Sequence, residues 1–158
     1  MDRFRKRLDW VLDTAVNTLM IVLLVAASAQ VFWRYVLNSP LAWSEEFARY
    51  TFVWLVFLAA CIAFRDGKHM AVDLVPPLLS PGLRRIQGAI VKIILAVFFI
   101  IVLFVSPEII MLTMDQPSAS LSIPIGLVYL SFPFSLLIML IYLILDIAAC
   151  RKQGDTQP

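Results

Sequence analysis

The 158-residue chain contains few side chains of the kinds that hold metals, bind haem or act as nucleophiles. It has one histidine, His69, and two cysteines, Cys61 and Cys150, with no Cys-x-x-Cys pair. A haem held by two histidines of this chain is therefore excluded, as is a multi-histidine metal site. Five glycines form no nucleotide-binding motif. We expect no enzyme activity and no cofactor, and we expect the cysteines to be packing residues.

One stretch concentrates charge directly before apolar sequence. Trp-Ser-Glu-Glu-Phe-Ala-Arg at residues 43–49 is followed by fifteen uncharged residues, 50–64. Ser44 is a natural helix N-cap, because its hydroxyl can accept from amides of the first turn. Glu45 and Glu46 would then lie where the helix dipole favours negative charge.

The same stretch contains a candidate ion-pair cluster. Glu45 and Arg49 have i, i+4 spacing with the acid first, which is the better orientation for a helical pair. Arg34, at a similar depth on the preceding apolar segment, could complete a neutral group of two arginines and two glutamates. This group could be buried against another polypeptide, or it could only hold the two helices together. The full candidate set is Arg34, Trp43, Glu45, Glu46 and Arg49.

The elements that must position these residues are membrane spans. The chain is 61% hydrophobic and 15% charged, and its mean hydropathy is +0.89. Residues 14–33 and 126–145 carry no charge, and each run gives about 30 Å of helix, the thickness of a bilayer core. We predict an all-α integral membrane protein with a single domain of four transmembrane helices, near residues 12–37, 43–64, 84–106 and 125–148. The pattern leaves open whether the third helix ends at Pro107 or bends and continues.

The distribution of lysine and arginine predicts the orientation. If the helices alternate in direction, one side of the membrane receives Arg3, Arg5, Lys6, Arg7, Arg65, Lys68, Arg84, Arg85, Arg151 and Lys152. The connection 107–124 on the other side contains neither residue type. By the positive-inside rule, both termini are cytoplasmic. A cleavable signal peptide is not expected, because apolar sequence continues past the small residues 27–29.

Two features of the cytoplasmic half carry open alternatives. Lys92, inside the third span, could reach the headgroups with its long stem or could belong to an ion pathway. In the connection after Arg65, His69 and Asp73 could hydrogen-bond if this part is helical. Residues 71–83 could form a short helix along the membrane interface or an ordinary basic loop.

Taken together, these motifs resemble the small membrane subunit, or DctQ-type subunit, of tripartite ATP-independent periplasmic (TRAP) transporters. The resemblance covers nearly the whole chain. Its elements are Arg34-Tyr35, Trp43, Glu45-Glu46, Arg49, the Arg-x-Gly-x-His-x-x-Val-Asp pattern from Arg65 through His69 to Asp73, and Pro124 with Gly126 and Tyr129 before the fourth helix.

The resemblance implies a non-catalytic scaffold in the bacterial inner membrane. Such a subunit supports a much larger, elevator-type membrane subunit that carries the substrate and sodium sites. A periplasmic binding protein delivers an organic acid, such as a C4-dicarboxylate, sialic acid or another sugar acid. The expected partners are these two proteins and membrane lipids, and not nucleic acid. The resemblance also favours placing the charged cluster at or near the subunit contact.

Two other classes of protein remain as alternatives. A self-sufficient small transporter or channel, formed by several copies of this chain, would transport without the large subunit. A membrane-bound redox or haem carrier would show a cofactor absorbance band, which we do not expect.

Overall fold

The computed structural model describes residues 2–39, 41–67 and 81–154. His69, Asp73 and most of the segment 71–83 lie outside these described residues. The helices are α1 (Asp2–Tyr35), α2 (Ala42–Arg65), α4 (Pro81–Met114), α5 (Gly126–Tyr129) and α6 (Ser131–Gly154). The described residues form no strand beyond one isolated bridge, between Pro117 and Pro124.

Four helical stretches are long and apolar enough to cross a membrane, which confirms the prediction of an all-helical chain with four spans. They are Arg3–Tyr35, Ala42–Arg65, Ile86–Met114 and Gly126–Ile147. The observed α1 begins about ten residues before the predicted span, because the basic residues at its start are helical too.

The third predicted span does not end at Pro107. Instead, α4 runs through Pro107 to Met114. Proline removes one backbone hydrogen bond from a helix, but spans tolerate this loss when neighbouring groups adjust. Directly before the proline, the hydroxyl of Ser106 donates to the carbonyl oxygen of Val102 at 2.6 Å. The last span is interrupted instead: α5 and α6 are separated at Leu130, three residues before Pro133, a residue type that disturbs helical hydrogen bonding.

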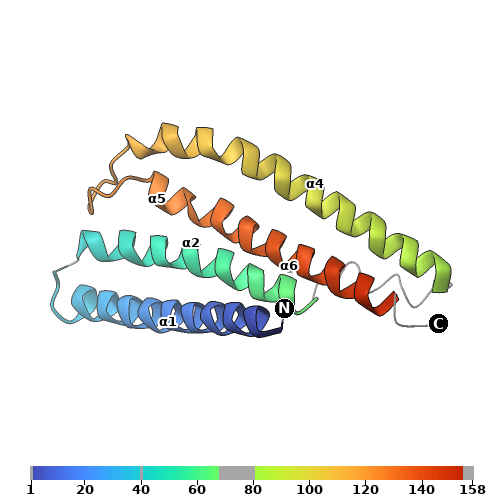
Figure 1. Cartoon of the computed structure of the whole chain (residues 1–158). Helices are drawn as coiled ribbons and strands as arrows, with labels where there is room; N and C mark the ends of the chain where they lie inside the picture. Colours follow the sequence, from blue (N-terminus) through green and yellow to red (C-terminus); the bar gives the residue numbers. More distant parts are fainter. Residues whose placement is uncertain (1, 40, 68–80, 155–158) are drawn as a thin grey trace.

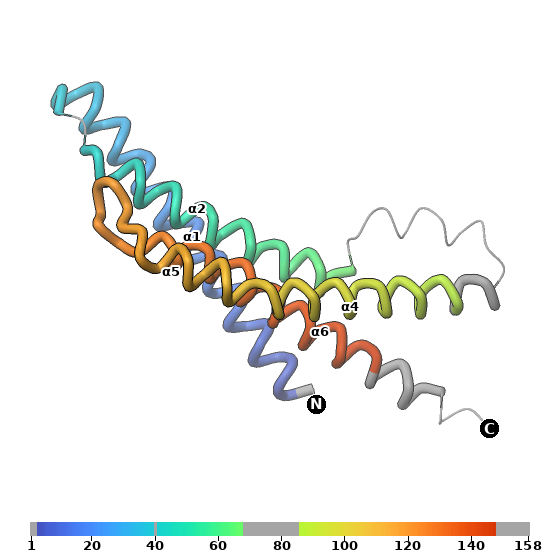
Figure 2. The backbone as a smooth tube through the Cα atoms, turned by 90° about the horizontal axis from the view of Figure 1, so that it is seen from above, coloured from blue at the N-terminus to red at the C-terminus, as the bar shows by residue number. Residues whose placement is uncertain are grey.

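The four long helices lie side by side in the order α1, α2, α6, α4 (Figure 1). Figure 2 gives the same arrangement from above and shows that the helices splay apart toward the ends of the chain. Within the most apolar stretch of each span, 22% of α2 and 33% of α6 are buried, against 0% of α1 and 6% of α4. The inner helices of the layer are therefore α2 and α6, and the outer ones are α1 and α4.

The small core lies along the contact between the two inner helices. Cys61 of α2 and Ser131 of α6 are completely buried, and Ser135 is 1% exposed. The thiol of Cys61 donates to the carbonyl oxygens of Phe57 and Ser135, at 3.4 and 3.3 Å. This confirms that Cys61 is a packing residue. The small side chains let α2 and α6 approach closely, as at many helix contacts in membranes.

The two chain ends lie at the same end of this layer (Figure 1). We call it the termini end; it comprises the first turns of α1, the end of α2 at Arg65 and the beginning of α4. The opposite, loop end comprises the connections 36–41 and 115–125. An even number of spans places both termini on one side in this way, whichever side that is.

Candidate functional site

The charged stretch at the start of α2 lies at the loop end. Ser44 does not cap the helix as predicted, because α2 begins earlier, at Ala42, with Leu41 in the N-cap position. The hydroxyl of Ser44 instead donates to the carbonyl oxygen of Leu41 at 2.7 Å. The helix start thus has no side-chain cap, although the acidic residues still lie near its positive end.

Glu45 and Arg49 form the predicted i, i+4 ion pair. Arg49 Nη2 lies 3.3 Å from Glu45 Oε1, and the two side chains are 66% and 63% exposed. A pair this exposed contributes at most about 1 kcal/mol to the stability of the folded chain. The pair is therefore available for contacts outside the chain.

Glu46 has a different role from that of Glu45. Its Oε2 accepts from the backbone amides of Ser120 and Leu121 at 2.9 and 2.8 Å, and its Oε1 accepts from the hydroxyl of Tyr50 at 2.8 Å. Glu46 thereby ties α2 to the connection between α4 and α5. The sequence motif did not reveal this link, because the partners are amides more than seventy residues away.

Arg34 lies on α1 and lines a small cavity of about 260 Å³ together with Glu45. Of the ion pairs between described residues, none joins Arg34 to either glutamate. The structure therefore brings Arg34, Glu45 and Arg49 to the same end of the α1–α2 hairpin, while Glu46 faces the neighbouring connection. It does not form one cluster of four paired charges.

Trp43 borders an apolar groove between α1 and α2. The groove has a volume of about 470 Å³, and Ala26, Ala29, Trp33 and Phe47 also line it. The Trp43 side chain is 48% exposed. Small residues on α1 and aromatic residues at the loop end thus leave a shallow apolar surface beside the exposed ion pair.

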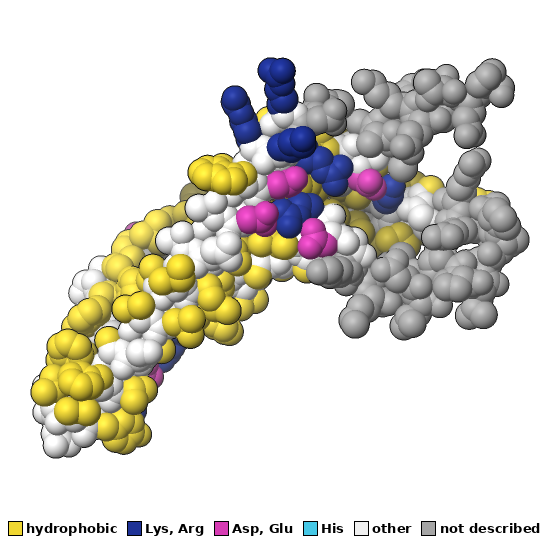
Figure 3. Space-filling model, turned by 90° about the horizontal axis from the view of Figure 1, so that it is seen from below, with side chains coloured by type: hydrophobic (Ala, Val, Ile, Leu, Met, Phe, Trp, Pro, Cys, Tyr) yellow, Lys and Arg dark blue, Asp and Glu magenta, His cyan; other side chains and the backbone are white. Residues whose placement is uncertain are grey.

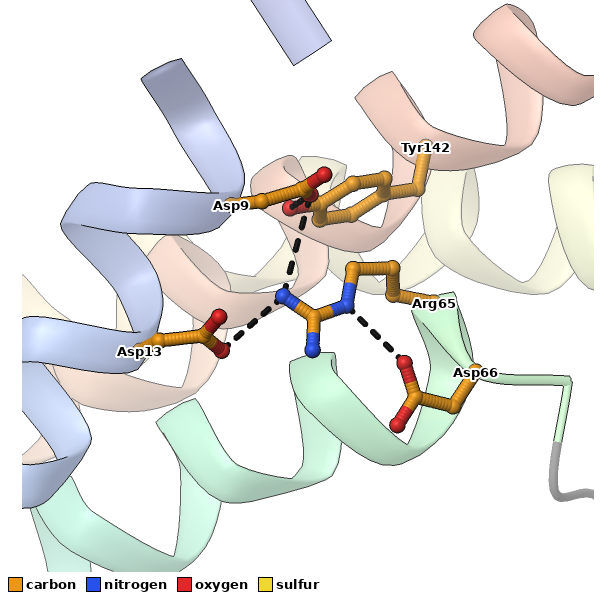
Figure 4. A network of polar contacts seen from close by, with 5 residues as sticks. All are labelled: Asp9, Asp13, Arg65, Asp66 and Tyr142. Atoms are coloured by element: carbon orange, nitrogen blue, oxygen red, sulfur yellow. Dashed lines mark hydrogen bonds and ion pairs between the residues drawn. The ribbon is translucent and has the colours of Figure 1, made fainter. Parts of the chain in front are cut away.

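Arg65, predicted as part of the cytoplasmic connection, is the centre of a polar network at the termini end (Figure 4). Its Nη1 lies 2.9 Å from Asp13 and 3.8 Å from Asp9, both on α1, and its Nε lies 3.0 Å from Asp66. The hydroxyl of Tyr142 on α6 donates to Asp9 at 2.6 Å. The network therefore joins α1, α2 and α6.

The sequence did contain a signal for this network. Asp9 and Asp13 are four residues apart, so they share one face of α1. Acidic residues inside a span require a partner, and Arg65 is the basic residue at the end of the next span. Tyr142 carried no such signal, because an isolated tyrosine in an apolar run is common near membrane interfaces.

Lys92 forms a second connection near the termini end. Its Nζ lies 2.7 Å from Asp146 Oδ2 and thus joins α4 to α6. The lysine side chain is 30% exposed and the aspartate 53%. The carboxylate accounts for a charge at this depth without a bound ion.

The residues before the fourth span lie in a tight connection. Pro124 faces Pro117 in the isolated bridge, and the amide of Ile125 donates to the carbonyl oxygen of Gln116 at 2.9 Å. Gly126 begins α5 at a point where an added Cβ would lie 2.9 Å from Met114 of α4. Tyr129 ends α5 and is 51% exposed.

None of these groups resembles a reaction centre. Within residues 2–39, 41–67 and 81–154, no three histidine, cysteine or acidic side chains lie where they could hold a metal ion. The polar contacts of Glu46, Arg65 and Lys92 join helices to one another or to a connection. This arrangement is suited to fixing the helices relative to one another.

Comparison with known proteins identifies a matching family and several related chains. The family model for the DctQ component of tripartite ATP-independent periplasmic transporters matches residues 23–153. A putative TRAP transporter small permease protein of Haemophilus influenzae is 29% identical over 124 residues, which cover 76% of this chain and 75% of the relative. The sialic acid TRAP transporter small permease protein SiaQ of Vibrio cholerae is 26% identical over 137 residues, covering 81% and 79%.

A third relative is a longer protein. The isethionate TRAP transporter permease protein DctMQ of Oleidesulfovibrio alaskensis is 29% identical over 137 residues, which cover 82% of this chain but 22% of the relative. Most of this chain therefore corresponds to about a fifth of that permease. With a matching family model over most of its length and four helices able to span a membrane, this chain belongs to the DctQ family of multi-pass inner-membrane components of tripartite ATP-independent periplasmic transporters.

Proposed function

We propose that this chain is a non-catalytic scaffold that supports the large membrane subunit of a TRAP transporter. The observation that carries the proposal is the relation to DctMQ, in which the counterpart of this chain is one part of a much longer permease polypeptide. Two chains that are joined in one relative commonly act side by side when they are separate. The polar contacts of Glu46, Arg65 and Lys92, which connect helices to one another or to a connection, support a mechanical role.

The transport reaction itself then belongs to the partner. We propose that the complex takes up an organic acid with sodium, and that a periplasmic binding protein delivers it and docks on the complex. The names of two relatives contain isethionate and sialic acid, and both compounds are organic anions. The lysine and arginine distribution supports a cytoplasmic position for the termini end and a periplasmic position for the loop end.

We further propose that the loop end of the α1–α2 hairpin contacts the large subunit. The exposed Glu45–Arg49 pair, Arg34 and the half-exposed Trp43 border the apolar groove there. Tryptophan and arginine are common at the energetic centres of interfaces. An ion pair that stabilises this chain little when exposed gains strength when a partner excludes water from it.

Substitution of Arg49 by alanine tests this contact. The pair is exposed, so R49A should change the stability of the isolated chain by less than about 1 kcal/mol. Co-expressed with the large subunit of the same organism, it should reduce the yield of the co-purified complex and the uptake of substrate. Unchanged co-purification and uptake would refute the contact at this residue, and K6A, at the termini end, is the matched control.

Liposomes distinguish the scaffold from a self-sufficient transporter. The purified chain alone should show no uptake of labelled sialic acid or isethionate under a sodium gradient, while the reconstituted complex should take up its substrate when the binding protein is present. Transport by this chain alone would overturn the scaffold proposal.

A further inference from the structure

The apolar groove between α1 and α2 leads into the small charged cavity at the loop end. Gln30 and Leu41 line both the groove, of about 470 Å³, and the cavity, of about 260 Å³, so the two lie next to each other. Gln30 and Ser44 are the exceptions in an otherwise apolar and aromatic groove lining. The cavity adds one cation and one anion, Arg34 and Glu45. Together they form a surface that is apolar along its length and charged at one end.

The groove has the length and depth of one acyl chain. It follows α1 from Ile21 to Trp33, which is about 18 Å at the helical rise. One leaflet contributes half of a hydrocarbon core of about 30 Å, or about 15 Å. The groove residues of α1 belong to the uncharged run 14–33, and Arg34 follows directly. The charged cavity therefore lies at the level of the lipid headgroups, where tryptophans such as Trp33 and Trp43 are common.

The wider surface agrees with this depth. On the face seen in Figure 3, most of the visible charged side chains gather in one region, and the long part of the molecule that leads away from it is almost entirely hydrophobic or uncharged. Charged groups are thus confined largely to the two ends of the layer. A ligand that occupies both the groove and the cavity must have an apolar part in the hydrocarbon and a polar part at its boundary.

The charges at this end of the hairpin are balanced. Arg34 and Arg49 carry two positive charges and Glu45 and Glu46 two negative ones, so the four sum to zero. Asp115, in the neighbouring connection, is also negative. No excess of positive charge therefore favours an anionic headgroup. A zwitterionic headgroup, with one phosphate and one ammonium group, matches a cavity lined by one cation and one anion.

Both charged side chains of the cavity have unused hydrogen-bonding capacity. Of the ion pairs between described residues, none includes Arg34, and a guanidinium group is well suited to binding a phosphate. Glu45 engages Arg49 through Oε1 only, in an exposed pair at 3.3 Å, so its Oε2 can accept from a ligand. A primary ammonium group has three N–H donors, whereas the trimethylammonium group of choline has none.

We propose that the groove and the cavity bind a zwitterionic phospholipid with a primary ammonium group, of the phosphatidylethanolamine class. One acyl chain lies in the groove, Arg34 binds the phosphate, and Glu45 accepts from the ammonium group. The lipid leaves the exposed Arg49 side chain for the proposed subunit contact. The inference goes beyond the scaffold function and concerns this chain alone, so it stands or falls without the large subunit.

Native mass spectrometry of the full chain tests the proposal. The protein, purified in a neutral detergent, is mixed with equimolar phosphatidylethanolamine and phosphatidylcholine, and the bound lipids are counted. Wild-type protein should retain phosphatidylethanolamine about fivefold better, the factor that corresponds to a well-placed exposed ion pair. E45Q should bring the two lipids close to equal retention, whereas R34Q should lower the retention of both, because both contain a phosphate.

E108Q is the matched control for E45Q. Glu108 is exposed on α4, at the other edge of the layer, and does not line the groove or the cavity. An equal loss of preference in E108Q and E45Q would indicate general attraction of the ammonium group to acidic side chains and overturn the site. Equal retention of the two lipids by wild-type protein would also overturn it.

A second pair of variants tests the groove with all charges retained. A29L fills the groove, because Ala29 lines it, whereas A27L adds the same side chain at an exposed position outside the lining. A29L should lose the bound lipid and A27L should keep it, with circular dichroism confirming that both variants are folded. Equal retention by the two folded variants would overturn the groove as the acyl-chain site.

The assembled complex distinguishes a lipid from a protein segment as the occupant. Co-purified with the large subunit, this chain should still retain phosphatidylethanolamine. A complex that excludes the lipid would show that a segment of the large subunit fills the groove, and this result would overturn the lipid as its occupant in the transporter.

Discussion

Gly126 lets α5 lie against the end of α4, and one added methyl group should disturb this contact. A Cβ at position 126 would lie 2.9 Å from Met114 Cγ, 3.0 Å from Met114 Sδ and 3.0 Å from the carbonyl oxygen of Ile110. Ordinary contacts between carbon atoms are about 3.5–4.0 Å. The methionine side chain can rotate away, but the carbonyl oxygen is part of the α4 backbone, so the G126A variant must shift α5.

The expected magnitude follows from comparison with a second glycine. Overpacking of this kind costs about 1–3 kcal/mol. At Gly88, inside α4, a Cβ would meet nothing within 4 Å, so G88A should stabilise the chain by about 0.5–1 kcal/mol through helix propensity. The same substitution should therefore have opposite signs at the two positions. A difference of about 2 kcal/mol corresponds to about 30-fold in the unfolding equilibrium constant.

The assay is reversible unfolding in mixed micelles of a mild detergent and sodium dodecyl sulfate. The four tryptophans report tertiary structure by fluorescence, and circular dichroism reports helix content. Only position 126 is crowded, so equal stability of G126A and G88A, including equal destabilisation of both, would refute the close approach of α5 to α4.

Three further predictions use the polar and buried contacts of the inner helices. Y142F removes a hydrogen bond to a carboxylate of α1, so it should destabilise the chain by about 1.5–3 kcal/mol in the same unfolding assay; an unchanged midpoint would contradict the bond. E46Q weakens the acceptor for two amides of the 115–125 connection, so hydrogen exchange should quicken there, whereas the exposed control E45Q should leave that exchange unchanged. The Cys61 thiol, in a C150S background, should react with a maleimide only as the chain unfolds, because Cys61 has no exposed surface; rapid labelling of the folded chain would contradict the α2–α6 packing.

The number of helices, and the fact that they span a membrane, could be predicted from the sequence alone. Uncharged runs such as 14–33 and 126–145 have one plausible use at this length, because few other structures need twenty apolar residues in succession. The i, i+4 pair of Glu45 and Arg49 was predictable for a similar reason, since both its partners lie on one helix. Local spacing determined both results.

Contacts between distant parts of the chain were not predictable in the same way. Glu46 has the same type and nearly the same position as Glu45, yet its partners are the amides of Ser120 and Leu121. The pairing of Lys92 with Asp146 depends on which helices are neighbours, and hydropathy contains no information about neighbours. The passage of α4 through Pro107 depends likewise on local adjustment that composition does not reveal.

The order of helices in the layer also has a consequence for synthesis at the ribosome. The α1–α2 hairpin emerges first, but the helix that covers its inner face is α6, the last to be made. One contact between them joins Cys61 to Ser135, 74 residues later, and another joins Asp9 to Tyr142, 133 residues later. During translation, the Cys61 thiol of α2 and the Asp9 carboxylate of α1 lack these α6 partners until the C-terminal helix enters the bilayer. Truncation of α6 should therefore leave a membrane-inserted but unfinished chain, which quality-control proteases would remove.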